Sequence, residues 1–285
     1  MTRLTLIALA ALLAQDPVPE REWIVPDLAV LAVEDEAAAQ FFDRRVDVFG
    51  CRILASRRVP EAKLLHAAHV LAQYIDNDED GVPDDEKVAG WLADNTATLV
   101  MFDSARRMDR SGLFETDLLD DIVGQDNHAD ETHPGGRGGK IPFDATLEEV
   151  WHLVSNGWEA VYEKDFGYRA GSRLCDAMDK ARGGRFKRIP RRYPEGAWYS
   201  YDDRTCDYGC MAAEYFYWTL TSLLGAQTHP LRQREIAREW RAPTAALLAE
   251  KDPAVFSLLT DELFSLPRTL PDGTYRSDPP EDESD

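Results

Sequence analysis

Residues 146–154 read TLEEVWHLV, an apolar pattern with helical spacing that sets how the rest of the chain is interpreted. On a helix, Glu148 and His152 are four residues apart and share one face. An H-E-x-x-H helix presents two ligands to one metal ion by the same spacing. Glu149 lies about 100° round the helix, where that motif places the general base of a zinc hydrolase. The stretch therefore predicts a metal site in which the carboxylate of Glu148 replaces an imidazole.

The exchange of an imidazole for a carboxylate changes the chemistry expected of this site. A carboxylate oxygen binds zinc, as an imidazole nitrogen does, so Glu148 can keep the ligand position. The added negative charge weakens the pull of the ion on a bound water, and the pKa of that water should rise. A harder ligand set also makes manganese, iron or calcium more competitive with zinc. An ordinary amphipathic helix is the alternative, because paired acids in a first turn suit the helix dipole.

A third ligand is expected on a downstream helix, which reads MAAEYFYWTLTSLLGA and contains Glu214. Its start resembles the glutamate helix, x-E-Y-F-A-E-A-F, of gluzincins of the lethal-factor and Pro-Pro endopeptidase type. The match covers E-Y-F from Glu214 and ends at Trp218, where the second acid would fall. The order of predicted strands and helices over residues 46–225 is also similar to that of a zincin.

The resemblance implies an α+β, zincin-like fold, rich in helices, with a small mixed sheet, a metal helix and a downstream glutamate helix. It also implies roles for residues at matching positions. Glu148, His152 and Glu214 would hold zinc or another divalent transition metal. Glu149 would be the general base, and Tyr208 is the nearest counterpart of a tyrosine that donates to the developing oxyanion in that peptidase type.

Residues 76–87 read DNDEDGVPDDEK and predict a calcium loop. Three carboxylates alternate before Gly81, which permits a sharp turn, and a fourth follows at the ninth place. The loop resembles those of EF-hand, dockerin-like and thrombospondin-type repeats, although Lys87 is twelfth, where a bidentate acid is expected. The predicted ligands are Asp76, Asp78, Asp80, Asp84 and, in place of the twelfth, Glu86. The ion would hold two helices together; a solvated acidic turn is the alternative.

Residues 1–14 predict a secretory signal peptide, so we expect a secreted protein, extracellular or periplasmic. Arg3 precedes an apolar run that is too short to span a bilayer, and no later segment is apolar for long enough to do so. Four cysteines in an exported chain predict two disulfides. The short spacing in CDYGC favours Cys206–Cys210, which leaves Cys51–Cys175 to join distant segments.

The formal charge of −20, from 52 acids against 32 bases, repels phosphate backbones and argues against nucleic acid as a partner. Hydrophobic residues at 44% suit a globular protein. The chain has no G-x-S-x-G elbow, P-loop or dinucleotide fingerprint. The resemblance implies a peptide or protein substrate, and no pattern indicates an oligomeric state.

The chain divides into four predicted segments. They are the signal peptide at 1–14, an extended lead-in at 15–45, a single zincin-like domain at 46–265 and a disordered acidic tail at 266–285. Within the domain, residues 46–140 form the half with the strands, the backing helix and the calcium loop. Residues 141–265 form the half with the metal helix.

Periodicity and breakers predict the elements of the domain. We expect a strand over 46–56, a helix from Pro60, a helix over Glu86–Asp94, a strand over Thr98–Phe102 and a short strand from 120–123. Thr146-x-x-Glu149 has the form of a capping box. The aromatic segment 193–201, YPEGAWYSY, predicts a packed loop, with a substrate wall as the alternative.

Four further histidines are candidates for the metal site or its cleft. His66 and His69 lie three residues apart on the backing helix, where packed neutral side chains are expected. His128 and His133 precede the metal helix and could line the cleft or supply an imidazole.

The sequence thus predicts a secreted zincin-like metal-dependent hydrolase that acts on peptides, with a Glu/His/Glu metal site and calcium as a second cofactor. The alternative is a catalytically inactive zincin-like secreted protein that binds calcium and has a structural or interaction role.

Overall fold

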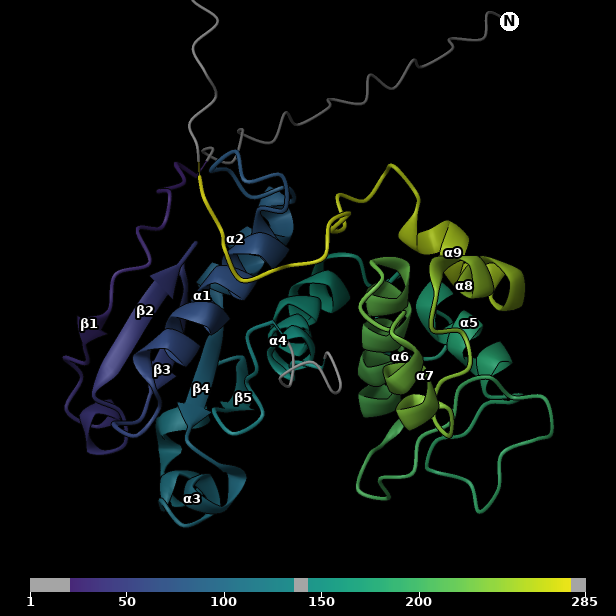
Figure 1. The fold of residues 1–285 in the computed structure, drawn as a ribbon, viewed down its shortest axis with the longest axis horizontal. Coiled ribbons are helices and arrows are strands. Elements are labelled where there is room, and N and C mark those ends of the chain that lie inside the picture. Colours follow the sequence, from purple (N-terminus) through teal and green to yellow (C-terminus); the bar gives the residue numbers. More distant parts are fainter. Residues whose placement is uncertain (1–20, 136–142, 278–285) are drawn as a thin grey trace, which may run out of the picture.

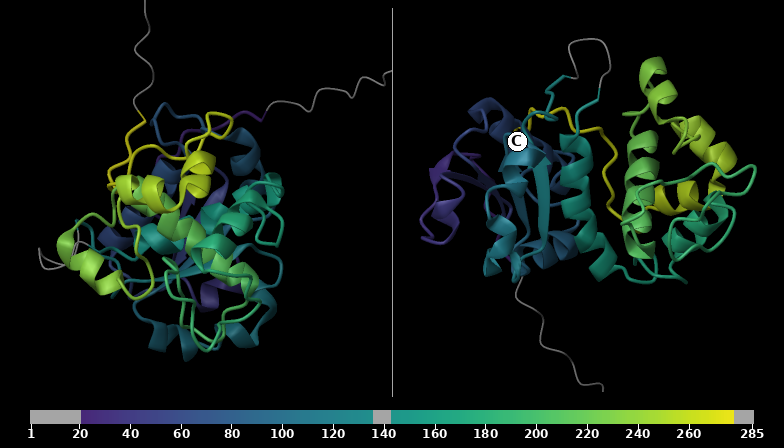
Figure 2. Two further views of the ribbon diagram at one scale, coloured as in Figure 1. Left: turned by 90° about the vertical axis from the view of Figure 1, so that its right-hand side faces the viewer. Right: turned by 90° about the horizontal axis from the view of Figure 1, so that it is seen from below.

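The computed structural model describes residues 21–135 and 143–277, so the predicted signal peptide lies outside the described residues. The described chain forms a mixed α and β fold with nine α-helices and one five-stranded sheet. The sheet lies at one end, helices α5 to α9 lie at the other, and α4 stands between them (Figures 1 and 2). The coarse prediction of a helix-rich fold with a small mixed sheet is confirmed.

The sheet has the order β1-β2-β3-β4-β5, antiparallel from β1 to β3 and parallel from β3 to β5. Its strands are β1 (Leu31–Ala32), β2 (Arg44–Val48), β3 (Cys51–Ala55), β4 (Thr98–Phe102) and β5 (Gly124–His128). β4 has its predicted bounds. β5 begins after the segment 120–123, because its pairing with β4 starts at Gly124 opposite Thr98. β1 and the start of β2 lie within residues 15–45, the segment that was predicted as an extended lead-in.

The single strand predicted over 46–56 is wrong, because the chain turns within it. Phe49 and Gly50 have positive φ values of 47° and 81° and form the turn between β2 and β3. Positive φ at both central residues is what a type I′ hairpin turn requires. Phe49 is buried although it occupies a turn position, so the apolar run concealed the turn.

Four of the nine described helices were predicted, those over residues 61–75, 86–94, 146–161 and 208–223, and the other five were not. The helices are α1 (Glu61–Ile75), α2 (Glu86–Asp94), α3 (Ala105–Asp109), α4 (Thr146–Val161), α5 (Arg173–Ala181), α6 (Tyr208–Leu223), α7 (Pro230–Ile236), α8 (Ala245–Lys251) and α9 (Pro253–Leu259). The capping box is wrong: Thr146 is already helical, and Glu149 bonds to β5 instead. α6 begins at Tyr208, before the predicted start, because Asp207 caps it. Within the described ranges, no helix combines the length and apolar character that a membrane crossing requires.

An aromatic contact fixes how α4 packs between the two halves. Trp151 of α4 is fully buried. Its ring centre lies 5.3 Å from that of Tyr74 on α1 and 5.0 Å from that of Phe216 on α6. α2 also comes so close to α4 that a Cβ on Gly157 would lie 2.8 Å from a methyl of Val88. Close packing against α1, α2 and α6 therefore fixes the position of α4.

The last described residues, 265–277, form an ordered segment, here called the C-terminal strap. It returns from α9 to α1 and the acidic loop at 76–87 (Figure 1). Leu266 and Tyr275 are only 2% and 5% exposed. The disorder predicted for the tail is therefore wrong up to residue 277, and the residues beyond it lie outside the described structure.

Two amide side chains hold the backbone of the strap. Asn77 Oδ1 accepts hydrogen bonds from the N–H groups of Arg268 and Thr269 at 2.7 and 2.8 Å. Asn77 Nδ2 donates to the Thr269 carbonyl at 2.9 Å. Gln73 Oε1 accepts from the N–H group of Gly273 at 2.8 Å. These contacts satisfy backbone groups of a segment that belongs to neither sheet nor helix.

One of the two predicted disulfides is wrong. Cys206 and Cys210 form a disulfide, as their spacing indicated. Cys51 and Cys175 are free thiols, each buried. Cys51 lies in β3 and Cys175 in α5, on opposite sides of α4 (Figure 1), so no disulfide can join them.

Asn77→Ala should destabilise the protein by about 1–3 kcal/mol, because it leaves strap N–H groups without an acceptor. Urea unfolding measures the loss, and tryptic cleavage after Arg268 should become faster. Asn95→Ala is the control, since exposed Asn95 Nδ2 bonds only to the Trp91 carbonyl within α2. Equal stability of the two variants would show that Asn77 does not hold the strap.

Candidate metal centre

α4 and α6 direct three of the predicted ligands to one place. Glu148 and His152 lie on α4, and Glu214 lies on α6. One ligand atom from each side chain lies within 4.8 Å of the other two, and His152 Nε2 is 3.6 Å from Glu214 Oε1. Ligands at about 2.0–2.1 Å from a tetrahedral ion lie about 3.4 Å from one another. The structure therefore brings these side chains together at nearly the spacing that an ion needs.

Burial gives the two carboxylates of this group a high affinity for protons. The side chains of His152 and Glu214 are 11% and 14% exposed. Burial, followed by the charge of Glu214, raises the pKa of Glu148 to about 7, and burial raises the pKa of Glu214 to about 7. Burial lowers the pKa of His152, which favours its neutral form. Two carboxylates and a neutral imidazole fit zinc or another divalent transition metal, which would displace the protons.

Glu149 lies beside the converging group and is held by the edge strand. Its Oε2 accepts a hydrogen bond of 2.5 Å from Gln125 Nε2 on β5. Burial and then the charges of Glu148 and Asp126 raise the pKa of Glu149 well above its ordinary value. A positioned carboxyl group with a high proton affinity suits proton transfer. The sequence placed Glu149 next to the ligands, but it gave no indication of Gln125.

Tyr208 does not lie with the ligands, contrary to its predicted role. Its hydroxyl donates to Asp179 Oδ2 at 3.2 Å, and its ring centre is 5.1 Å from the Arg182 guanidinium carbon. It begins α6, more than one turn before Glu214, and contacts residues of α5 and its C-terminal end. The tyrosine that contacts Glu214 is Tyr201, whose hydroxyl donates to Oε1 at 3.0 Å.

Tyr201 belongs to the aromatic segment 193–201, for which a packed loop was preferred. Tyr199 fits the packed loop, because it is fully buried and its hydroxyl donates to the Met211 carbonyl at 2.8 Å. Tyr201 instead reaches the candidate metal centre. No signal in the sequence distinguishes these two tyrosines.

A polar layer behind Glu148 was not identified from the sequence. Tyr217 follows Glu214 by three residues on α6, and its ring centre lies 5.8 Å from that of His152. Arg232 is buried on α7, and its charge attracts that of Glu148. Helical spacing from Glu214 could have indicated Tyr217, whereas no local pattern indicates Arg232.

The other histidines lie outside the converging groups found among the described residues. His66 is packed as expected, with Nε2 2.6 Å from Asp144 Oδ2, and it ties α1 to the start of α4. His69 is half-buried on the same helix. His128 Nε2 lies 3.4 Å from Asp126 Oδ2. The backbone N–H of His133 donates to Asp144 Oδ1 at 2.9 Å.

The acidic loop brings a second set of carboxylates together. Asp76, Asp78 and Asp84 each offer an oxygen within 4.8 Å of the others. Gly81 has a φ of 91°, and its N–H donates to Asp76 Oδ2 at 2.8 Å, so the glycine closes the turn as predicted. Burial raises the pKa of Asp84 to about 6. A cation with oxygen ligands fits this group.

Two of the predicted calcium ligands are not in that group. Asp80 Oδ1 accepts a hydrogen bond from the Val82 N–H at 2.8 Å. Glu86 Oε2 accepts one from Trp23 Nε1 at 3.2 Å, because Asp85 caps α2 and Glu86 starts its first turn facing outward. The prediction of five converging ligands is therefore wrong for Asp80 and Glu86.

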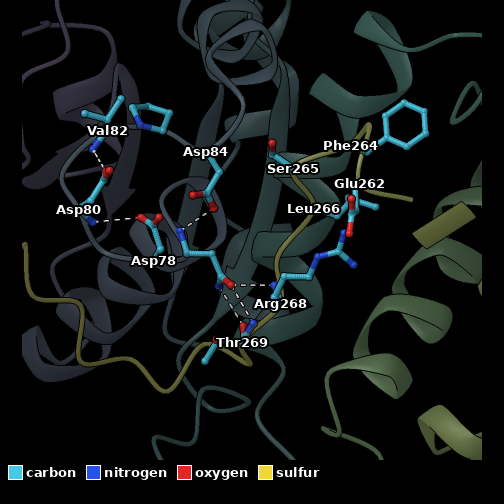
Figure 3. A pocket seen from close by; sticks show the side chains of 12 residues that line it. Asp78, Asp80, Val82, Asp84, Glu262, Phe264, Ser265, Leu266, Arg268 and Thr269 are labelled. Carbon is cyan, nitrogen blue, oxygen red and sulfur yellow. Dashed lines mark hydrogen bonds between the residues drawn. The ribbon is translucent and has the colours of Figure 1, made fainter. Parts of the chain in front are cut away.

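The acidic loop faces a cavity of about 630 Å³ between the loop and the C-terminal strap. Asp78 and Asp84 line one side of it, and the segment from Phe264 to Thr269 lines the other (Figure 3). The open side of the carboxylate group is therefore accessible to a small ion.

Comparisons of the chain with protein-family models, with curated proteins and with solved structures find no match. The likeness to gluzincins rests on the E-E-x-x-H and E-Y-F segments, and function must be inferred from the chemistry of the site.

The metal-free protein should lose stability as the pH rises from about 5 to about 8. Folding raises the pKa of Glu148 from 4.5 to about 7. The folded state therefore binds this proton more tightly than the unfolded state does. The resulting stabilisation is complete below a pH of about 4.5 and is lost as the pH rises through about 7. Thermal unfolding with a chelator at several pH values measures the fall. It should be smaller in Glu148→Gln and unchanged in Glu250→Gln, an exposed control on α8. Identical pH profiles for Glu148→Gln and the wild type would contradict the prediction.

Proposed function

We propose that this chain is a secreted, zincin-like, metal-dependent hydrolase that acts on peptides. The observation that carries the proposal is the convergence of Glu148, His152 and Glu214 from two helices, beside a third acid, Glu149. Three protein ligands leave one position of a tetrahedral ion open, which is the arrangement of catalytic zinc sites.

Each side chain around the site has a role in this proposal. A bound divalent ion would supply Lewis acidity and make a bound water more acidic. Glu149 accepts the proton of the attacking water and returns it to the leaving amine. Gln125 orients the Glu149 carboxyl group, and Tyr201 orients Glu214 by its hydrogen bond. A bound divalent charge would lower the pKa of Glu149, which could then act as a base.

A zincin-like protein without turnover is the second candidate. Glu148 adds negative charge to the ligand set and so weakens activation of water. Burial also raises the pKa of Glu149, and a protonated carboxyl group cannot accept a proton. In this alternative the protein is a secreted scaffold with a structural or interaction role. Both candidates bind a metal ion, and turnover distinguishes them.

We also propose that Asp76, Asp78 and Asp84 bind calcium, with a structural role. Calcium prefers several oxygen ligands in a flexible arrangement, and these carboxylates come from one turn closed by Gly81. The hydroxyl of Tyr275 donates to Asp76 Oδ2 at 2.5 Å, so the group that would bind the ion also anchors the strap.

The purified protein should bind about one transition metal ion, and His152→Ala should lower the affinity at least about 10-fold. Glu149→Gln should keep the metal and lower the hydrolysis of a peptide library by about 100-fold or more, because the general base is lost. Metal analysis, chelator competition and peptide cleavage measure these effects. His69→Ala, a half-buried histidine of α1, is the control for metal binding. Peptide cleavage that is undiminished in Glu149→Gln would show that Glu149 is not the general base. Metal binding that is unaffected by His152→Ala would refute the metal site.

Millimolar calcium should raise the thermal unfolding midpoint, because an ion at about 100 times its Kd adds about 2.7 kcal/mol. Asp78→Asn should abolish this response, and tryptic cleavage of the strap should slow with calcium only in proteins that bind it. Asp120→Asn, an exposed acid far along the chain from the loop, should respond as the wild type does. A wild-type midpoint that is independent of calcium would refute the calcium site.

A further inference from the structure

Arg232 is a buried cation whose partners surround the candidate metal centre. The residue is 5% exposed, and its guanidinium carbon lies 3.7 Å from the centre of the Phe143 ring. Nε donates to Gln227 Oε1 at 2.9 Å, and Nη2 donates to the Tyr217 hydroxyl at 3.4 Å. Nη1 donates to Glu235 Oε2 at 3.1 Å, at the more exposed end of the guanidinium. A buried guanidinium is costly unless opposite charge lies nearby.

Tyr217 connects this cation to the first predicted ligand. Its hydroxyl oxygen receives two hydrogen bonds, from Gln227 Nε2 at 3.2 Å and from Arg232 Nη2 at 3.4 Å. A tyrosine hydroxyl has one proton, and the Tyr217 hydroxyl lies near enough to the Glu148 carboxylate to lower its pKa by interacting with it. The Tyr217 hydroxyl therefore lies between the guanidinium, which donates to it, and the carboxylate of Glu148.

The charges of this arrangement favour a carboxylate at position 148. A divalent ion with Glu148 and Glu214 is neutral overall, and Arg232 has Glu235 as its partner. An imidazole at position 148 would give the ion and its ligands a net positive charge, which would face a buried guanidinium. Repulsion of this kind is strong where little water screens it.

We propose that Arg232 and Tyr217 are positioning residues that hold Glu148 as a metal ligand, and that they match a carboxylate rather than an imidazole at this position. The inference rests on the proposed metal site and deepens it. Groups that orient metal ligands change the affinity for the metal when they are removed. The loss of Arg232 should therefore have opposite effects when position 148 is Glu and when it is His.

The test is a mutant cycle read by metal affinity. Zinc and manganese affinities are measured by competition with a chromophoric chelator, and circular dichroism checks folding. Tyr217→Phe and Arg232→Gln should each weaken binding about 10- to 100-fold. Glu148→His alone creates H-E-x-x-H yet should bind more weakly than the wild type, and adding Arg232→Gln should strengthen it about 10-fold or more.

The matched control is Tyr215→Phe on the same helix. It also removes a buried hydroxyl that donates to a carboxylate, Asp252 Oδ2 at 2.5 Å, away from the metal centre. Its stability should fall while its metal affinity stays the same. If Arg232→Gln does not fold, Arg232→Lys keeps the charge without the planar fork, and its affinity should lie between those of the wild type and Tyr217→Phe.

The outcomes separate this inference from the proposed function. A wild-type protein that binds neither metal refutes both. Wild-type binding that Tyr217→Phe and the Arg232 variants leave within about threefold refutes the positioning role alone. Additive effects of Glu148→His and Arg232→Gln refute the match between the guanidinium and the carboxylate.

Discussion

Two carboxylates that repel each other, those of Glu148 and Glu214, lie across the contact between α4 and α6. Their position follows from the core behind them, where Trp151 and Phe216 meet with ring centres 5.0 Å apart. A close-packed interior does not stretch to relieve a local repulsion. The charge must therefore be compensated in place, by protons, by Arg232 or by a bound cation. The packing of the core therefore determines the negative charge that the site has to neutralise.

The sequence predicts four of the nine described helices and β4, where the local pattern is strong, but it missed α3, α5 and the short helices α7 to α9. The apolar spacing of α1, the Asp85 cap of α2 and the buried run of β4 each determine their own element. The hairpin between β2 and β3 was missed because Phe49 fills the core from a turn position. The C-terminal strap was missed because its composition is that of a disordered tail. Its order depends on amides that are far away in the sequence, such as Asn77.

The same distinction applies to the candidate site. Helical geometry alone places Glu148 and His152 on one face, and the E-Y-F pattern indicates Glu214. The supporting groups come from separate elements, so no spacing rule identifies Gln125 or Arg232. The role predicted for Tyr208 was wrong for a related reason. Proximity along the chain does not determine which tyrosine contacts Glu214 in the folded protein. The Cys51–Cys175 disulfide was wrong because a count of cysteines contains no distances.

The C-terminal strap also imposes an order on biosynthesis. Tyr275 bonds to Asp76 across 199 residues, and contacts of such separation close late because of the loop entropy that they require. The acidic loop leaves the ribosome long before the hydroxyl that completes it has been made. A chain that ends early would have both the sheet and α1, yet its acidic loop would lack the Tyr275 hydroxyl and the backbone groups of the strap. Residues 265–277 thus complete a half of the molecule that is translated well before them.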